Sequence, residues 1–238
     1  MTRHNEFGQP IGENVTGWAP RPRPPETPML GRTCRLEKLD PDRHARALYA
    51  AYREAPDWRD WTYLPRGPFD TEAAYIAWAR ENAALDDPWH FAVLVGNEPV
   101  GSLAHMRIDP ANGVIEVGAI MYAPRLQRTP AATEAVYLMM RRAFDELGYR
   151  RHEWKCDALH AGSRRAAERY GFRFEGVFAQ AVIYKGRSRD TAWYAVTDKE
   201  WPVLRAAFEA WLASENFDGQ GRQKQSLASL RAAPGKRG

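Results

Sequence analysis

Hydrophobic and polar positions follow two patterns between residues 33 and 212, one typical of strands and the other of amphipathic helices. Runs of mainly apolar residues predict strands at 33–38, 90–96, 99–108, 113–122, 152–159, 172–184 and 189–197. Apolar positions three or four residues apart predict helices at 41–54, 70–85, 131–147 and 163–170, and a last helix that begins near Asp198 or Lys199. Strands and helices share one region of the chain, which indicates an α/β domain.

Turn and capping residues mark the borders of these elements. Gly96-Asn97-Glu98-Pro99 and the turn at 109–113 join three successive strands, which predicts an antiparallel meander. Asp40 is a typical helix N-cap because a proline follows it, and Gly148 lies where a C-cap glycine belongs. The strand, helix and strand within 114–157 require a crossover connection, so these two strands are expected to pair in parallel within a mixed sheet.

The two ends of the chain differ from this alternating region. Residues 1–31 form a Pro-rich extension whose run APRPRPPETP cannot hold a helix, so we expect an extended strap anchored by Ile11 and Trp18. Residues 216–238 are polar, rich in glycine and basic, which predicts a flexible, loosely held tail. The folded domain is accordingly expected to span residues 32–215.

Composition narrows the class of protein. Hydrophobic residues make up 44% and charged residues 27%, as in ordinary globular proteins, and no apolar run approaches the roughly 18 residues that span a bilayer. The start of the chain lacks the apolar core of a signal peptide, and Cys34 and Cys156 match no disulfide or metal spacing. We therefore expect a cytoplasmic protein without a metal centre or a membrane partner. The net charge of +4 suits either nucleic acid or a polyanionic small ligand.

A strand–turn–helix junction at 114–134 is the clearest candidate for binding chemistry. The unpaired N–H groups at a helix start, together with the helix dipole, attract phosphate. Arg125 and Arg128 flank the turn, and Thr129 is placed to cap the helix or to bond a phosphate oxygen. The two arginines are equally compatible with solvated surface charge.

This junction resembles the acetyl-CoA-binding motif of the GNAT N-acetyltransferase superfamily, in which a strand leads to a Q/R-x-x-G-x-G/A turn and then a helix. Further along lie D-x-x-x-x-x-S-R-x-A-x-E-x-x-G-F-x-x-E-G, G-R-x-R-D-T and D-x-E-W-P, which are similar to the RimJ/RimL-like branch of ribosomal-protein alanine N-acetyltransferases. The resemblance covers about residues 32–203. It implies a GNAT-like, largely antiparallel central sheet flanked by helices, acetyl-CoA as cosubstrate and direct acetyl transfer to a primary amine. A homodimer is left open.

The turn departs from the family motif because its glycines are missing. Pro130 removes one backbone donor, and the methyl groups of the alanines that follow narrow the approach to the backbone. The remaining backbone donors are those of Leu126, Gln127, Arg128, Thr129, Ala131 and Ala132.

The resemblance also assigns contacts to the rest of the cofactor. It implies that backbone N–H groups near Ile120, Met121 and Tyr122 hold the pantetheine arm and polarise the thioester carbonyl. His160 stands where the family often has an asparagine that bonds this arm. A histidine can make one such hydrogen bond, and an exposed loop histidine is the equal alternative.

Two residues are candidates for proton transfer. Glu116 lies within the apolar strand VIEVGAIM, where a carboxylate is costly unless it is hydrogen-bonded or functional, so it is the leading candidate for the base that deprotonates the amine. Strand alternation places it on one face with Gly118 and Ile120. The alternative is that Glu116 faces solvent or pairs with an arginine. Ser163 is a candidate proton donor to the departing thiolate, with a helix N-cap as the alternative.

The loop at 56–68 is the candidate acceptor site. Trp58, Trp61 and Tyr63 are closely spaced there beside two aspartates, and an aromatic and acidic wall suits an amine or a cationic N-terminus. Tryptophans in a proline-rich loop also serve as packing anchors, and this alternative stays open.

Three classes of function remain. The first is an N-acetyltransferase acting on a protein N-terminus or a small-molecule amine. The second is a CoA-binding protein without transferase activity, used as a sensor or an interaction subunit. The third, a nucleic-acid-binding module, requires basic residues interleaved with aromatics on one surface. The aromatics here lie in the loop and in core runs instead, so no direct nucleic-acid partner is expected.

Overall fold

Eight strands form one mixed sheet in the order β3-β4-β5-β6-β7-β8-β10-β9 in the computed structural model, which describes residues 3–232. Neighbouring strands run antiparallel except β7 and β8, which are parallel. The strands of the sheet are β3 (Met29–Leu30), β4 (Arg35–Lys38), β5 (Trp89–Val95), β6 (Glu98–Asp109), β7 (Val114–Tyr122), β8 (Arg151–Asp157), β9 (Arg173–Tyr184) and β10 (Arg187–Thr197). A separate hairpin is made of β1 (Arg3–His4) and β2 (Pro10–Ile11).

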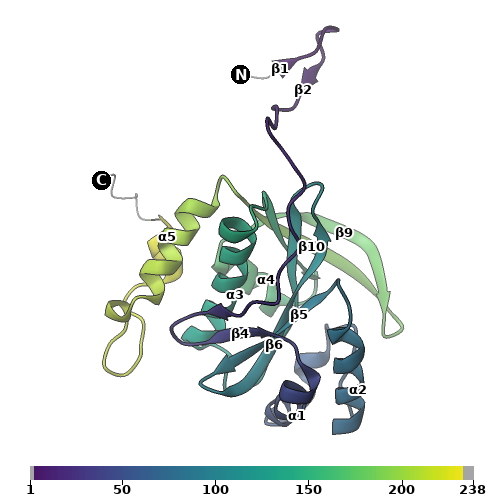
Figure 1. The fold of residues 1–238 in the computed structure, drawn as a ribbon, viewed down its shortest axis with the longest axis vertical. Helices are drawn as coiled ribbons and strands as arrows, with labels where there is room; N and C mark the ends of the chain where they lie inside the picture. The colour runs from purple at the N-terminus through teal and green to yellow at the C-terminus, as the bar shows by residue number, and fades with distance from the viewer. Residues whose placement is uncertain (1–2, 233–238) are drawn as a thin grey trace.

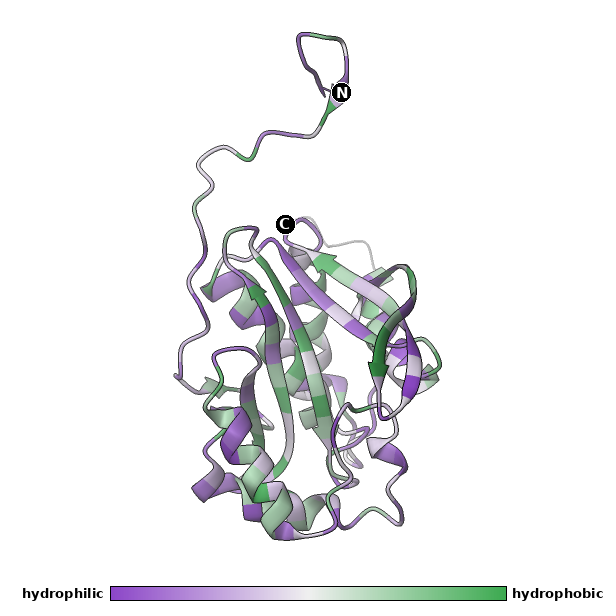
Figure 2. Ribbon diagram, turned by 90° about the vertical axis from the view of Figure 1, so that its right-hand side faces the viewer, coloured by the Kyte–Doolittle hydropathy of each residue, from purple (hydrophilic) through white to green (hydrophobic). Residues whose placement is uncertain are grey.

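Helices cover both faces of this sheet (Figures 1 and 2). They are α1 (Pro41–Tyr52), α2 (Glu72–Ala83), α3 (Pro130–Arg141), α4 (Ala161–Tyr170), α5 (Trp201–Leu212) and α6 (Leu227–Ala232). Short 3-10 turns lie at Arg59–Trp61 and Ser214–Asn216, and a π-helical turn lies at Arg142–Glu146. The helices α3 and α5 pack on one face with the larger core, and α1 and α2 pack on the other face with a second core.

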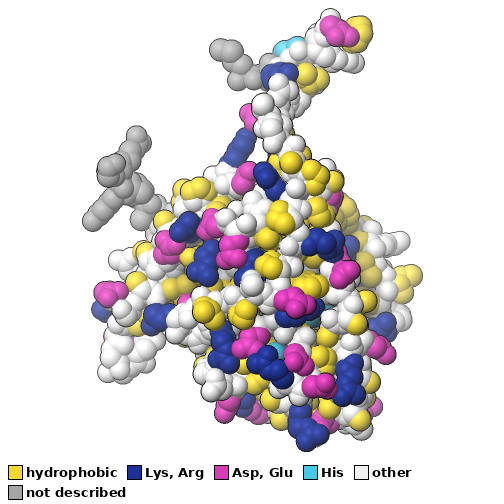
Figure 3. Space-filling view, viewed as in Figure 1, with side chains coloured by type: hydrophobic (Ala, Val, Ile, Leu, Met, Phe, Trp, Pro, Cys, Tyr) yellow, Lys and Arg dark blue, Asp and Glu magenta, His cyan; other side chains and the backbone are white. Residues whose placement is uncertain are grey.

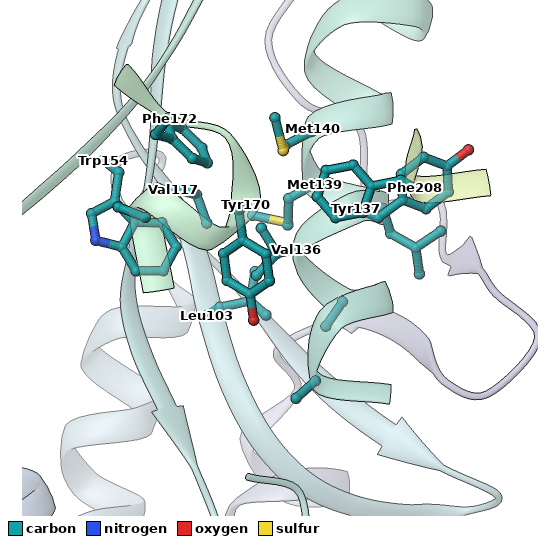
Figure 4. Close-up of a cluster of buried hydrophobic side chains, with 14 of the residues drawn as sticks. Leu103, Val117, Val136, Tyr137, Met139, Met140, Trp154, Tyr170, Phe172 and Phe208 are labelled. Atoms are coloured by element: carbon teal, nitrogen blue, oxygen red, sulfur yellow. The ribbon is translucent and has the colours of Figure 1, made fainter. Parts of the chain in front are cut away.

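The larger core explains why α3 is apolar nearly all round. Its residues 131–140 are all buried, because the sheet covers one side of the helix and α5 covers another. Figure 4 shows Val136 and Met139 of α3 among Leu103 and Val117 of the sheet and Tyr170 of α4. Each large side chain buried in this way stabilises the fold by about 1.5–3 kcal/mol.

The architecture expected from the sequence is confirmed. The strands β5, β6 and β7 form the antiparallel meander, and the crossover through α3 makes β7 and β8 the parallel pair. Asp40 caps α1 through its carboxylate, but Thr71 caps α2 one residue later than the start expected at residue 70. The helix expected up to residue 147 is α-helical only to 141, because a π-type bond from Leu147 N to Arg142 O (3.0 Å) closes its last turn.

A bulge in β7 changes the direction of its side chains. Ser102 pairs with Met121 and Ala104 pairs with Gly118, so β7 holds one extra residue in this interval. Ala119 has a φ of +49°, in the left-handed region. The expected alternation that placed Ile120 on the face of Glu116 is therefore wrong. Ile120 instead packs with the α3-side core, as Val117 does before the bulge.

The Pro-rich strap is fastened to the domain at several places, among them the contacts of Trp18 and of Thr27. Trp18 Nε1 donates to Ala111 O (2.7 Å), and the indole ring covers Gly113. Further along, the buried guanidinium of Arg142 donates to Thr27 O from both terminal nitrogens (3.0 Å each). Trp18 is an anchor as expected, whereas Ile11 is exposed on the β1–β2 hairpin, which stands away from the body in Figures 1 and 3.

Part of the segment expected as a flexible tail packs against the domain. Trp211 Nε1 donates to Gln223 Oε1 (2.8 Å), and Asn216 Nδ2 donates to Trp211 O (3.0 Å). Leu227 of α6 is almost fully buried in the larger core. Leu230 and Phe217 also pack against this core, but these few apolar residues are widely spaced in a polar stretch, so periodicity did not reveal them. Residues 233–238 of the expected tail lie outside the described residues.

Two buried histidines lie side by side on the face of the sheet that carries the larger core. His105 on β6 and His152 on β8 are fully buried with ring centroids 5.7 Å apart. None of their ring nitrogens has a hydrogen-bond partner within residues 3–232. Burial lowers the pKa of His152 to about 3, and burial, with help from the other ring and Arg142, lowers the pKa of His105 well below its usual value. Both rings are therefore neutral at pH 7.

This pair makes the fold sensitive to acid. Because the folded-state pKa of His152 lies below the unfolded value of about 6.5, stability is fully present above pH 6.5 and is lost as the pH falls toward 3. For this residue we expect unfolding to cost about 2 kcal/mol less at pH 5 than at pH 7.5. Urea unfolding gives the free energy of unfolding at each pH. In His152→Phe, the difference between the two values should be about 2 kcal/mol smaller than in the wild type. The exposed His4→Phe change is the control and should leave the pH dependence unaltered.

Candidate active site

The strands β7 and β8 pair over only three residues and then separate. Val114, Ile115 and Glu116 pair with the first three residues of β8, and no further pairing is recorded along the described lengths of the two strands. Ala123 N donates to Val100 O on β6, so alternation turns the backbone groups of Tyr122 away from β6. Gln127 Nε2 donates to Tyr122 O (3.0 Å), in agreement with this direction. The free edge of β7 thus faces the gap between the strands.

A cavity of about 1050 Å³ occupies this gap and extends to the start of α3. Its walls come from the end of β7, the turn before α3, α4, the loop after α1 and the C-terminal segment around Phe217. Ten of the residues that the sequence indicated line it: Tyr63, Ile120, Met121, Tyr122, Gln127, Arg128, Thr129, Ala132, His160 and Ser163. Residues that are spread over about 100 positions of the sequence therefore meet around one cavity.

Six indicated residues do not line the cavity: Trp58, Trp61, Glu116, Arg125, Leu126 and Ala131. The side chains of Leu126 and Ala131 are buried in the larger core. Arg125 points elsewhere, because it forms ion pairs with Glu54 and with Glu98 (3.3 Å). Arg125 is therefore held outside the cavity by two carboxylates from other elements, although it flanks the turn as the sequence indicated.

The turn before α3 has fewer free donors than its sequence suggested. Thr129 caps the helix, and its Oγ1 accepts from Ala132 N (3.2 Å). The amides of Leu126 and Gln127 donate to Ala123 O, and the amide of Thr129 donates to Leu126 O. Within the described chain, only two of the six expected amides are without a partner, those of Arg128 and Ala131.

The conformation of the turn accounts for the family's preference for glycine. Arg128 has a φ of +61°, a left-handed conformation that glycine adopts at little cost and other residues adopt at about 1 kcal/mol or more. Arg128 lines the wall of the cavity. A positive side chain therefore stands where the family motif has a bare backbone.

The charged residues of the cavity are mainly positive. Arg59, Arg128, Arg165 and Arg169 line it, against a single acid, Asp60. The last two arginines were not singled out from the sequence, although their spacing of four residues on a helix places them on one face. Together with the α3 N-terminus they make this end of the cavity suited to a polyphosphate.

His160 occupies the helix N-cap position that was the alternative expected for Ser163. His160, not Ser163, caps α4, and its Nδ1 accepts from Ser163 N (3.4 Å). Burial lowers the pKa of His160, which favours the neutral ring that such a cap needs. Ser163 Oγ accepts a hydrogen bond from Trp154 Nε1 (2.9 Å), which leaves its own hydrogen available to another partner. Ser163 is thus a cavity-lining hydroxyl rather than a cap.

The loop after α1 is tied down across the cavity. Gln127 Nε2 donates to Asp60 Oδ2 (2.9 Å), and Tyr63 stacks on His160 with ring centroids 4.3 Å apart. Lys185, from the tip between β9 and β10, donates to Trp61 O (2.7 Å). Contacts from three other elements therefore fix this loop beside the end of β7.

The three aromatics of this loop have different surroundings. Tyr63 lines the large cavity. Trp61 is buried among Tyr52 and Phe69 and lines a second, smaller pocket on the α1–α2 side. Trp58 lines neither cavity and lies beneath the guanidinium of Arg53, 5.2 Å from its ring centroid. Trp58 thus fits the alternative of a packing anchor.

Glu116 is buried in a cluster of charges on the α1–α2 face of the sheet. Its Oε2 lies 3.0 Å from Arg107 Nε and 3.1 Å from Lys155 Nζ, and Lys155 Nζ also lies 2.6 Å from Glu153 Oε2. This pairing is the alternative that the sequence left open. Burial raises the pKa of Glu116, although Lys155 and Arg107 oppose the rise. Its Oε1 lies near Gly118, beside Met106 of the second pocket.

Comparison with known proteins gives the family. A profile described as an acetyltransferase (GNAT) domain matches residues 34–173. A GCN5-related N-acetyltransferase from Brucella melitensis is 48% identical, and its crystal structure aligns with a TM-score of 0.90 over 92% of this chain and 100% of that chain. The uncharacterized N-acetyltransferase YnaD of Bacillus subtilis is 25% identical over 154 residues, which are 64% of this chain and 88% of the relative.

The chain therefore belongs to the GNAT acetyltransferase family. These relatives support an acetyltransferase, and the family typically uses acetyl-CoA. The cavity fits that cofactor, because it joins an arginine-rich helix N-terminus to the free edge of β7. No helix within residues 3–232 combines the length and the apolar character needed to cross a membrane.

The two arginines of the turn should differ in their effect on cofactor binding. We expect Arg128→Ala to weaken CoA binding about ten-fold, because a charged hydrogen-bond donor leaves the cavity. Arg125→Ala is the matched control and should bind CoA as the wild type does, because Arg125 is held by Glu54 and Glu98. Titration calorimetry with CoA measures both. Equal losses in the two variants would contradict the assignment of Arg128 to the phosphate end.

Proposed function

We propose that this protein is an acetyl-CoA-dependent N-acetyltransferase that moves an acetyl group directly to a primary amine. The observation that carries the proposal is the continuous cavity from the arginine-rich start of α3 to the unpaired edge of β7. The motifs after Asp157 support a place in the RimJ/RimL-like branch, and a protein N-terminus and a small-molecule amine both remain as acceptors. The buried, free Cys34 and Cys156 support a cytoplasmic setting.

We assign the cofactor contacts to two regions of the cavity. Arg128, Arg165 and Arg169 would hold the phosphates together with the free amides of Arg128 and Ala131. Acetyl-CoA, when bound, supplies the acetyl group as an activated thioester. The backbone groups of Ile120 and the amide N–H of Tyr122, at the edge of β7, would hold the pantetheine arm and orient the thioester carbonyl, and His160 would flank them.

We assign the two proton transfers to opposite sides of β7. Glu116 lies on the face of the second pocket, and its raised pKa suits a group that accepts the proton of an amine near neutral pH. Ser163 lines the large cavity with a free hydroxyl hydrogen, so it is placed to donate toward the sulfur that leaves. The base and the acid would thus reach the reacting atoms from different sides of the strand.

A second candidate is a CoA-binding protein without transferase activity. The turn before α3 favours it to the extent that four of its six amides are already bonded. Thiol release from acetyl-CoA, measured with a panel of amines and N-terminal peptides, separates the two. Heat stabilisation by CoA without turnover on any acceptor would favour the second candidate. Amine-dependent thiol release would favour the first.

Glu116→Gln should lower turnover about 100-fold and leave CoA affinity within two-fold of the wild type, because it removes the proton acceptor and not a wall of the CoA cavity. In the wild type, kcat/KM should fall as the pH drops below the raised pKa of Glu116, since a protonated carboxyl cannot accept a proton. The variant should lose this acid limb.

Glu153→Gln is the matched control, because Glu153 contacts the same lysine and carries the same charge. It should keep the turnover at high pH and keep the acid limb, with the limb moved to lower pH because the charge of Glu153 helps to raise the pKa of Glu116. Full turnover of Glu116→Gln at every pH, or an equal loss in Glu153→Gln, would remove Glu116 from the mechanism.

A further inference from the structure

A second pocket of about 130 Å³ lies on the α1–α2 side of β7, outside the large cavity. Four large aromatic side chains from three segments line it: Tyr52 of α1, Trp61 of the following loop, and Tyr75 and Trp78 of α2. The sheet contributes Ser102 and Met106 of β6 and Ala119 and Met121 of β7. These segments are distant in sequence and meet only in the fold.

The two cavities adjoin at the bulge of β7. Met121 lines both of them, Ala119 lines the smaller one and Ile120 lines the larger one. Consecutive residues therefore face opposite sides at the point where β7 has left β8. Glu116 lies on the side of the smaller pocket, next to Met106. An amine placed in the gap would have the large cavity on one side and this pocket on the other.

The lining of the smaller pocket is apolar and carries no negative charge. Among the described residues, no aspartate or glutamate lines it, and the formal positive charge is that of the exposed Arg66. Burial lowers the pKa of His90 to about 4, so this ring is neutral at pH 7. A second ammonium group of a substrate would lose its water here without gaining a counter-charge. Polyamines and other polycations therefore do not suit this pocket.

The size of the pocket matches one ring. A protein cavity of about 150 Å³ with apolar walls accommodates benzene, and this pocket is only slightly smaller. Tyr52 and Trp61 meet edge to face, as do Tyr52 and Tyr75, which leaves flat aromatic surfaces along the wall. Such walls favour a flat, neutral group over a charged or strongly hydrated one.

We propose that this pocket receives the side group of the acceptor amine, and that this group is neutral, apolar and about the size of a single ring. The inference rests on the proposed function. In the reaction the nitrogen of the neutral amine forms a bond to the acetyl carbon, the carbon–sulfur bond breaks, Glu116 takes a proton from the nitrogen, and the sulfur receives the proton of Ser163. Ser163 then regains a proton from water as Glu116 releases its own to water, so both groups return to their starting states. An arylalkylamine and a peptide with an N-terminal aromatic residue share the required chemistry.

The first test compares acceptors in the thiol-release assay. Phenethylamine should have a kcat/KM about 30-fold above that of ethylamine, because only the former fills the pocket. Spermidine should be no better than ethylamine. Among peptides, N-terminal Phe should exceed N-terminal Gly by a similar factor. A larger kcat/KM for the Phe peptide than for phenethylamine assigns the acceptor to a protein N-terminus, and the reverse order assigns it to a free amine.

A variant pair tests the location. Leu64→Trp places a ring inside the pocket, so the preference for phenethylamine over ethylamine should fall from about 30-fold to near one, with CoA affinity unchanged. Leu85→Trp introduces the same side chain at an exposed site outside the pocket and should keep the preference. A preference retained in Leu64→Trp would overturn the assignment.

Direct binding keeps the test independent of folding defects and of turnover. Binding of phenethylamine should quench the tryptophan fluorescence of the CoA-loaded wild type, because Trp61 and Trp78 line the pocket. The dissociation constant from this titration should be at least ten-fold lower than that of ethylamine. Equal kcat/KM values for the two amines would overturn the ring assignment and leave the proposed function standing. Absence of transfer to every amine, despite CoA binding, would overturn the proposed function, and the binding comparison would then decide on the pocket alone.

Discussion

The short pairing of β7 with β8 is the constraint on which the rest of the site depends. Three residue pairs join the strands, and beyond Glu116 the edge of β7 lies unpaired in the middle of an eight-stranded sheet. Backbone groups inside a protein need partners, so such an edge calls for side chains or a ligand. Gln127 supplies one partner at Tyr122 O. The remaining edge faces a cavity that begins where α3 starts. The unpaired backbone groups of β7 and the N-terminus of α3, which attracts anions, therefore open into the same cavity.

Side-chain charge compensates for the backbone chemistry that the turn has lost. A glycine turn would present bare amides, whereas here most of the amides of the turn bond within it. Arg128 occupies the left-handed position, and Arg165 and Arg169 of α4 face the same cavity. Guanidinium groups make charge-assisted bonds to phosphate that are stronger than those of neutral amides. Without the glycines, arginine side chains therefore replace backbone amides as the main groups that would bind an anion.

Local signals predicted most of the fold and much of the large site, and non-local contacts account for what they missed. Periodicity, caps and turns depend on neighbours in sequence, so the strands from β4 to β10, the helices from α1 to α5 and the turn before α3 were found, whereas α6 and the short strands β1 to β3 were not. The bulge at Ala119 depends on register with β6, and the diversion of Arg125 depends on carboxylates far along the chain. The smaller pocket forms where Tyr52, Trp61 and Tyr75 meet, and the sequence of no single segment predicts that these residues come together.

The strap that crosses the domain has a practical consequence for handling the protein. Arg142 is buried; both of its terminal nitrogens donate to the carbonyl of Thr27, and its Nε lies 2.6 Å from Glu146 Oε2. Trimming the chain to the family domain alone would remove that carbonyl and leave Glu146 as the remaining partner of a buried guanidinium, whose two terminal nitrogens would lose their shared acceptor. An affinity tag fused ahead of the β1–β2 hairpin would instead sit on a projecting arm, clear of the body. Expression plasmids should accordingly retain the prolines and extend the arm rather than shorten it.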